Sequence, residues 1–93
     1  MTELWTHGFA SPRGIVPLAQ HAEAAGWDGL CVVDSQNLSG DAYVALAMAA
    51  TATERLGLGT AVTNSVTRMA ATTASAIASV DRVANGRAVL GIS

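Results

Sequence analysis

The feature that most constrains this 93-residue chain is the regular spacing of four short apolar runs. One residue anchors each run, and successive anchors lie 26, 28 and 31 residues apart, at Leu4, Leu30, Leu58 and Val89. Each interval has room for a strand, a helix and two turns, so the chain repeats one βα unit. This repeat predicts parallel strands joined by right-handed crossovers.

The four runs, at residues 4–7, 30–34, 58–62 and 88–92, are the predicted strands. Residues 30–33 and 89–92 are continuously apolar, which is typical of strands buried on both faces of a parallel sheet. Three helices are expected between the runs, because apolar residues recur there at intervals of three and four. Their expected buried stripes are Ile15, Leu18, Ala19 and Ala22; Val44, Ala47, Met48 and Thr51; and Thr73, Ala76, Ile77, Val80 and Ala84.

The ends of these helices carry recognisable signals. Gly26 and Gly86 are placed to end the first and the third helix, since glycine adopts the left-handed backbone conformation that follows many helices. Asp41 is placed to cap the free amides at the start of the second helix.

Two architectures use a repeat of this kind. A doubly wound sheet usually binds its ligand at a glycine-rich first turn, but residues 8–14 match neither GxGxxG nor GxxxxGK[ST]. We therefore interpret residues 1–93 as one α/β domain, the N-terminal half (β-α-β-α-β-α-β) of a TIM (β/α)8 barrel, truncated after its fourth strand. A doubly wound binding domain is the alternative.

The composition limits the classes of binding partner and the cellular compartment that we expect. Apolar residues make up 51% of the chain and charged residues 13%, so we expect the remainder of a barrel or a homo-oligomer partner to cover part of the surface. A net charge of −2 without a basic run argues against nucleic acid and anionic membranes. No apolar run reaches the roughly 18 residues of a membrane helix, and the N-terminus does not resemble a signal peptide. With one cysteine and no disulfide framework, the cytoplasm is the expected compartment.

Polar residues follow all four predicted strands. They are His7, then Asp34 with Ser35, Gln36 and Asn37, then Thr63, Asn64 and Ser65, and finally Ser93. The active sites of barrel enzymes lie at these strand ends, so we expect a small-molecule site here. His7 and Asp34 are the candidate catalytic residues. The alternatives are a structural histidine and a carboxylate that only satisfies loop amides. His7 has no second histidine at ligand spacing, so no metal is expected.

Arg68 is a further candidate. A cation in the first turn of a helix opposes the helix dipole at a cost of about 0.3 kcal/mol or more, which is better tolerated where an anion or a carboxylate binds. A salt bridge to another loop is the alternative for Arg68. His21 is expected on the surface, while Cys31 is expected to be a small core residue and Trp5 a packing residue.

Four motifs carry a family resemblance. They are VDSQNL at residues 33–38, ATERLGLGT at 52–60, VTNSVTR at 62–68 and NGRAVLGI at 85–92. Together they resemble the bacterial luciferase-like superfamily, and within it the coenzyme F420-dependent branch that is similar to methylenetetrahydromethanopterin reductase. This resemblance implies an oxidoreductase that transfers a hydride between F420 and a small organic substrate. An FMN-dependent monooxygenase of the same superfamily and a non-catalytic half-barrel that acts only by association are the alternatives.

The resemblance also implies roles for individual residues. A non-prolyl cis peptide is implied at Ala61–Val62, beneath the central ring of the cofactor. Asp34 would contact the ring region, Thr63 and Asn64 would line the cofactor's tail, and Ser93 would begin a loop with further cofactor contacts. This chain departs from the family pattern where relatives often have His-Pro after the arginine and Gly-Ile-Gly in the fourth strand. At the first place this chain has Met69 and Ala70, and at the second it has Gly91, Ile92 and Ser93.

Overall fold

The computed structural model describes residues 2–35 and 38–93 of the chain. Gln36 and Asn37, which the sequence places after the second strand, lie outside the described residues. The elements follow the predicted order: β1 (Trp5–Gly8), α1 (Ile15–Ala24), β2 (Gly29–Val32), α2 (Ala42–Ala52), β3 (Gly57–Thr60), α3 (Ala70–Val83) and β4 (Ala88–Val89).

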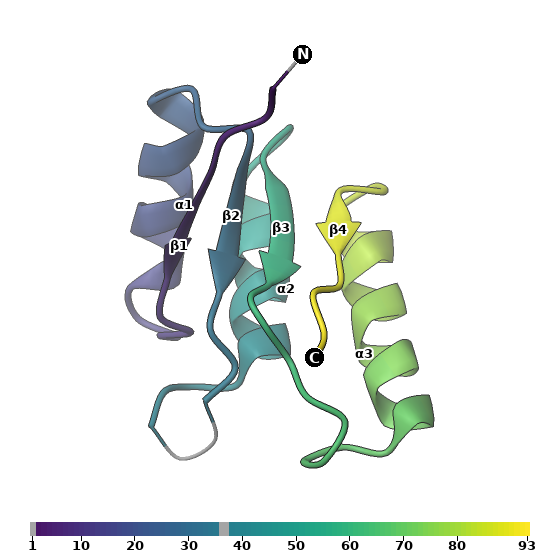
Figure 1. Ribbon diagram of the computed structural model, residues 1–93. Coiled ribbons are helices and arrows are strands. Elements are labelled where there is room, and N and C mark those ends of the chain that lie inside the picture. The colour runs from purple at the N-terminus through teal and green to yellow at the C-terminus, as the bar shows by residue number, and fades with distance from the viewer. Residues whose placement is uncertain (1, 36–37) are drawn as a thin grey trace.

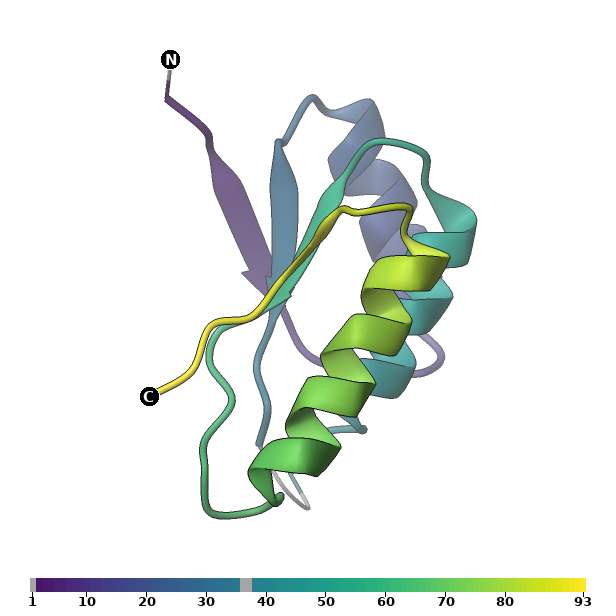
Figure 2. The same cartoon turned by 90° about the vertical axis from the view of Figure 1, so that its right-hand side faces the viewer.

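The strands form one parallel sheet in the order β1-β2-β3-β4 (Figure 1). Thr6, Leu30, Leu58 and Ala88 stand side by side in its register. All three helices cover the same face of the sheet (Figure 2). A doubly wound sheet would carry helices on both faces and reverse its strand order, so that alternative is wrong. The arrangement is that of the N-terminal part of a TIM barrel, as predicted.

The hydrophobic core lies between the sheet and the helices. Leu30, Val32 and Leu58 are fully buried there. Ile15 of α1 and Leu46 of α2 are buried in the same cluster. Strand side chains alternate between the two faces of the sheet. Every second residue of each strand therefore points into this core, and the residues between them point to the opposite face.

The helix ends behave as predicted. Gly26 and Gly86 have φ angles of 89° and 88°, the left-handed conformation that glycine adopts without a Cβ clash. The Asp41 carboxylate accepts hydrogen bonds from the backbone N–H groups of Tyr43 and Val44, at 3.1 and 3.0 Å, and so caps α2. The predicted stripes of α1 and α3 are also confirmed, with Ile15, Ala19 and Ala22 buried in the first and Thr73, Val80 and Ala84 in the third.

The predicted buried stripe of α2 is wrong at two of its four positions. Val44 is 52% exposed and Thr51 is exposed, whereas Ala47 and Met48 are partly buried against the core. The face that packs on the core carries Tyr43, Leu46, Ala49 and Ala50 instead. Because almost every position of this helix is apolar, periodicity alone does not define a face.

The sheet face opposite the helices is open. Residues 89–92 were predicted to be buried on both faces, but Val89 is 50% exposed and Ile92 is 51% exposed. Regular pairing in β4 ends at Val89, and a single bridge joins Thr63 to Ile92 further along. The cause is the one-sided cover, since no helix in the described part of the chain packs on this face (Figure 2).

Trp5 covers the end of the open face where the strands begin. It stands in register with Gly29, and a Cβ on Gly29 would lie 2.3 Å from the indole ring. A Cβ on Gly57, in the next strand, would lie 2.7 Å from the same ring. The two glycines therefore leave the space that the indole fills, and the predicted packing role of Trp5 is confirmed.

A carboxylate from α1 fastens the start of β3. Glu23 accepts hydrogen bonds from the backbone N–H groups of Glu54, Arg55 and Leu56, the shortest at 2.8 Å. Burial raises the pKa of Glu23, but these three amides outweigh it, and the pKa lies below its ordinary value. This contact lies at the opposite end of the strands from the candidate site.

In the described residues, no helix is long and apolar enough to span a bilayer.

Candidate functional site

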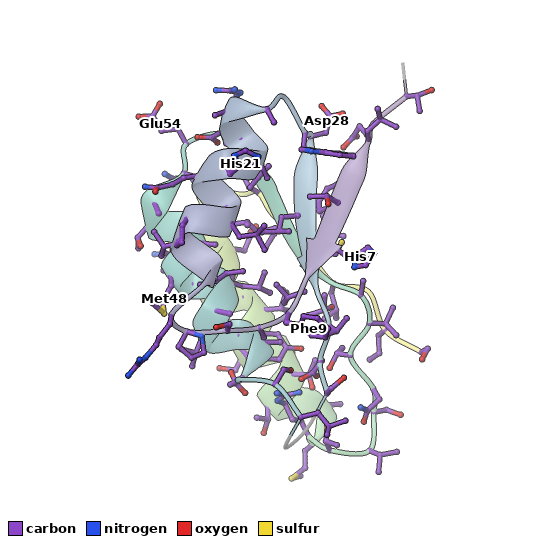
Figure 3. All side chains as sticks on the ribbon, turned by 90° about the vertical axis from the view of Figure 1, so that its left-hand side faces the viewer. His7, Phe9, His21, Asp28, Met48 and Glu54 are labelled. Carbon is purple, nitrogen blue, oxygen red and sulfur yellow. The ribbon has the colours of Figure 1, made fainter. Side chains whose placement is uncertain are left out.

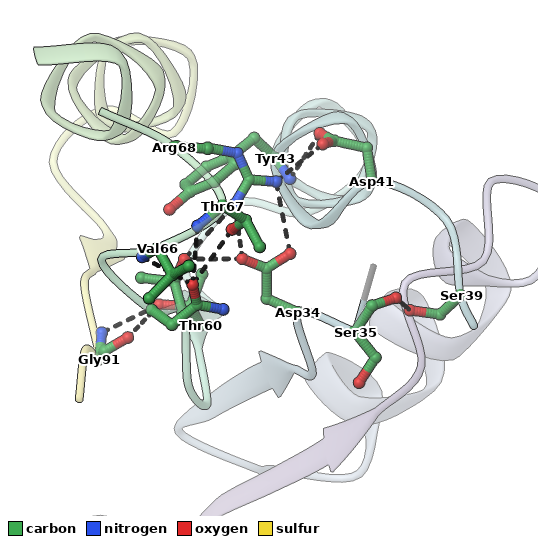
Figure 4. A network of polar contacts seen from close by, with 12 residues as sticks. Asp34, Ser35, Ser39, Asp41, Tyr43, Thr60, Val66, Thr67, Arg68 and Gly91 are labelled. Carbon is green, nitrogen blue, oxygen red and sulfur yellow. Dashed lines mark hydrogen bonds and ion pairs between the residues drawn. The ribbon is translucent and has the colours of Figure 1, made fainter. Parts of the chain in front are cut away.

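A buried ion pair joins the end of β2 to the loop after β3 (Figure 4). The side chain of Asp34, two residues beyond β2, is 1% exposed. The guanidinium of Arg68 donates from Nη1 to Oδ2 at 2.6 Å and from Nη2 to Oδ1 at 3.3 Å. Such two-pronged contacts fix orientation as well as charge, so they hold the two loops in one relative position.

Arg68 also contacts the start of α2. Its Nη2 donates to Oδ1 of Asp41 at 3.0 Å, and its guanidinium carbon lies 4.7 Å from the centre of the Tyr43 ring. The hydrogen bond to Asp34 is the main reason that the pKa of Arg68 lies above its ordinary value. A guanidinium over an aromatic face gains a further cation–π attraction.

This geometry corrects the sequence interpretation of Arg68. α3 begins at Ala70, so Arg68 precedes the helix and does not sit in its first turn. The argument from an opposed helix dipole therefore does not apply. The alternative, a salt bridge to another loop, is what the structure shows.

Thr63 connects three strand ends. Its hydroxyl donates to Oδ2 of Asp34 at 2.6 Å. Its backbone N–H donates to the carbonyl of Gly91 at 2.8 Å, and its carbonyl accepts from the N–H of Ser93 at 3.1 Å. The ends of β2 and β3 and the segment after β4 are thus tied together at one residue that is fully buried.

The peptide between Ala61 and Val62 is cis, as the family resemblance implies. The N–H of Ala61 donates to the carbonyl of Val32 at 2.8 Å, which keeps this turn against β2. The Val62 side chain is 48% exposed. An apolar, half-exposed surface therefore lies directly beside the Asp34–Thr63 contact.

Asn64 shapes its own loop. Its Oδ1 accepts hydrogen bonds from the N–H groups of Val66 and Thr67, at 2.9 and 3.0 Å. This is the Asx-type turn that asparagine commonly forms. The side-chain oxygen of Asn64 is therefore occupied within the loop.

The other predicted site residues lie apart from the cluster. His7 is exposed on β1, on the side of the sheet away from the helices (Figure 3), and no hydrogen bond of the described residues joins it to Asp34. Its register partner is Cys31, which is half-buried on the open face rather than in the core. Burial raises the pKa of that thiol.

Ser93 is exposed and reaches the cluster through its backbone only. His21 is exposed on α1, as expected.

Sequence reasoning missed Tyr43. Its ring stacks under Arg68 and is 7% exposed, and its hydroxyl is buried without a hydrogen-bond partner in the described structure. One signal could have identified it, because Tyr43 is the single tyrosine of the chain and lies two residues after the capping Asp41. Asp41 itself was predicted only as a cap.

The arrangement suits a fixed anion better than a proton acceptor. Both oxygens of Asp34 face the guanidinium of Arg68, and one also accepts from Thr63, which favours the ionised carboxylate. Residues 2–35 and 38–93 contain no group of three or more side chains able to hold a metal ion.

The profile of the luciferase-like monooxygenase family matches residues 2–93. The chain belongs to this family. The chain is 42% identical over 78 residues to 5,10-methylenetetrahydromethanopterin reductase from Methanolobus tindarius. The aligned residues make up 84% of this chain and 24% of that protein. The chain thus spans about a quarter of the length of this relative.

Solved structures agree with the family assignment. The coenzyme F420-dependent tetrahydromethanopterin reductase from Methanopyrus kandleri superimposes with a TM-score of 0.91 and 30% identity, over 97% of this chain and 26% of that one. The monooxygenase RslO1 from Streptomyces bottropensis superimposes with a TM-score of 0.80 and 26% identity, over 87% of this chain and 26% of that one. The chain therefore belongs to a family of luciferase-like oxidoreductases whose members include F420-dependent reductases.

Proposed function

We propose that this chain forms the first four βα units of an F420-dependent oxidoreductase. The complete protein would transfer a hydride between the deazaflavin and a small organic substrate. Residues 1–93 would belong to a single barrel domain that the remainder of the barrel, or a partner subunit, completes. The observation that carries the proposal is the superposition of 97% of the chain on an F420-dependent reductase, with a TM-score of 0.91.

The residues present fit a planar cofactor. Val62 offers a half-exposed apolar surface next to the buried Asp34–Thr63 contact. A deazaflavin ring needs such a flat apolar surface flanked by polar groups that fix its orientation. His7 is exposed at the end of β1, within the same rim of strand ends. When bound, F420 would supply the hydride chemistry.

The chain's own residues would bind the cofactor and fix its orientation. Val62 would support the ring and Asn64 would line the cofactor's tail. Thr63, which is fully buried, would hold this segment in place through its contacts with Asp34 and Gly91. Asp34, held by Arg68, would keep a fixed negative charge near the ring without exchanging a proton. Ser93 would begin further contacts. Of the two candidate catalytic residues, His7 is exposed and could meet substrate, whereas the side chain of Asp34 is buried.

A segment exchange tests this proposal. Residues 1–93 would replace the matching segment of the Methanopyrus kandleri reductase, because the two superimpose closely. We expect the folded hybrid to quench F420 fluorescence on titration, with an affinity within about tenfold of the parent. A hybrid that keeps the parent's circular dichroism and melting behaviour but binds no F420 would contradict the proposal.

An FMN-dependent monooxygenase is the second candidate. It is favoured by the likeness to the monooxygenase RslO1 and by the family profile itself. The same titration with FMN distinguishes the two. Binding of FMN in preference to F420, with oxygen consumption on reduction, would select the monooxygenase.

A further inference from the structure

A side chain takes the place of backbone pairing where β3 and β4 end. Regular pairing between the two strands stops at Gly59 and Val89. Beyond it, the hydroxyl of Thr60 donates to the carbonyl of Gly91 at 2.8 Å and accepts from the N–H of the same residue at 3.0 Å (Figure 4). Thr60 is 3% exposed, so these contacts are shielded from water. One buried hydroxyl therefore binds both backbone groups of Gly91.

Gly91 is bound from both sides of the Ala61–Val62 turn. The carbonyl that accepts from Thr60 also accepts from the N–H of Thr63 at 2.8 Å. Thr60 and Thr63 are the residues that flank Ala61 and Val62 in the chain. Because both flanking residues bind one carbonyl oxygen, the turn between them is fixed relative to the segment after β4.

The backbone of Gly91 also lies close to the Val62 side chain. A Cβ on Gly91 would lie 2.3 Å from the carbonyl oxygen of Thr60 and 3.4 Å from Cγ1 of Val62. A side chain at position 91 would therefore push this segment away from β3, and glycine allows the close approach. Val62 is nevertheless 48% exposed, so the contact supports its side chain without covering it.

We propose that Thr60 is a positioning residue for the cofactor. This inference rests on the proposed function, in which Val62 supports the planar ring. The Thr60 hydroxyl holds Gly91 against the turn and so fixes the position of the Val62 surface, although Thr60 itself is buried and does not meet the ring. The residues behind a binding surface must hold it within about 0.5 Å of the productive geometry. Loss of the hydroxyl would leave the N–H of Gly91 without its partner and allow the turn to shift.

Titration of the hybrid reductase with F420 tests this role. Thr60→Val removes the hydroxyl and keeps the shape of the side chain, and we expect the Kd for F420 to rise by at least about tenfold. A second comparison covers a Thr60→Val hybrid that fails to fold. Thr60→Ser and Thr60→Ala both lack the methyl group and differ only in the hydroxyl, so Thr60→Ser should bind F420 more tightly than Thr60→Ala by a similar factor.

Thr53→Val is the matched control. The Thr53 hydroxyl is also buried, where it donates to the carbonyl of Ala49 at 2.8 Å and accepts from Nη1 of Arg87 at 2.9 Å. It precedes β3 and so lies at the opposite end of that strand from Thr60. Both changes to valine should lower the melting temperature, but Thr53→Val should leave the Kd for F420 within about twofold.

The outcomes separate this inference from the proposed function. A folded hybrid that binds no F420 before any of these changes would overturn both. Binding that Thr60→Val leaves unchanged, or that Thr53→Val weakens equally, would contradict the positioning role alone. Equal binding by Thr60→Ser and Thr60→Ala would also contradict it, because the hydroxyl would then have no effect on the cofactor.

Discussion

At the scale of single residues, Arg68 and Asp34 are the centre of the site. Their contact buries a carboxylate with 1% exposure, and Arg68 also reaches Asp41 and Tyr43. Sequence motifs identified Asp34, Thr63 and Arg68 individually. They did not reveal that the three touch, because the contacts cross 29 to 34 residues of chain and depend on how the loops after β2 and β3 fold.

Removing the guanidinium should be costly. Arg68→Met keeps an unbranched apolar stem but takes the cation away from the buried carboxylate, so we expect a loss of about 3 kcal/mol in the free energy of unfolding. Arg68→Lys should lose less, since it keeps the charge without the two-pronged geometry. Urea titration at fixed protein concentration measures both.

Arg82→Met is the matched control, because Arg82 is exposed in the last turn of α3. It should cost less than about 0.5 kcal/mol. If Arg68→Met cost no more than Arg82→Met, the ion pair would not hold the two loops together.

Glu23 gives a pH-dependent prediction. Its folded pKa lies below the ordinary value of 4.5, so its stabilisation is present above that pH and is lost as the pH falls through the lower folded pKa. Glu23→Gln should therefore lower the free energy of unfolding by about 1 kcal/mol at neutral pH, a figure reduced for its partial exposure. Urea titrations at several pH values should show the difference shrinking below pH 4.5. A difference that did not vary with pH would rule out the charged contact.

At the scale of elements, spacing predicted the order, number and direction of the helices and strands. It failed for part of the buried face of α2, because this alanine-rich helix is apolar at almost every position. It also failed for residues 89–92, because a continuous apolar run does not reveal whether both faces of a sheet are covered. The cis peptide at Ala61–Val62 came from the family resemblance and not from any local pattern.

The packing of Trp5 gives a prediction at this scale. Gly29→Ala would place a methyl group 2.3 Å from the indole, which forces β1 and β2 apart or displaces the ring. We expect a loss of roughly 2 kcal/mol in thermal or urea unfolding, the usual cost of overpacking. Gly14→Ala is the control, since its new Cβ would meet Ser11 at an ordinary 3.4 Å. Similar losses for both would show that the indole does not constrain Gly29.

At the scale of the whole molecule, the chain supplies one side of a barrel and one part of a site. The helices cover one face, the strands end in the Asp34–Thr63–Arg68 cluster, and the other face is open. The relatives described above are more than three times as long. The role proposed for this segment is therefore a share of cofactor binding and orientation.

Turnover by the hybrid reductase is the most direct measurement of the central claim. The hybrid carries residues 1–93 in the Methanopyrus kandleri enzyme, and oxidation of reduced F420 by the parent's own substrate is followed by absorbance. We predict turnover within about a hundredfold of the parent, and a further loss of about tenfold or more on Asp34→Asn, which removes the fixed charge proposed to lie near the ring. A folded hybrid that shows no F420-dependent turnover would contradict the account.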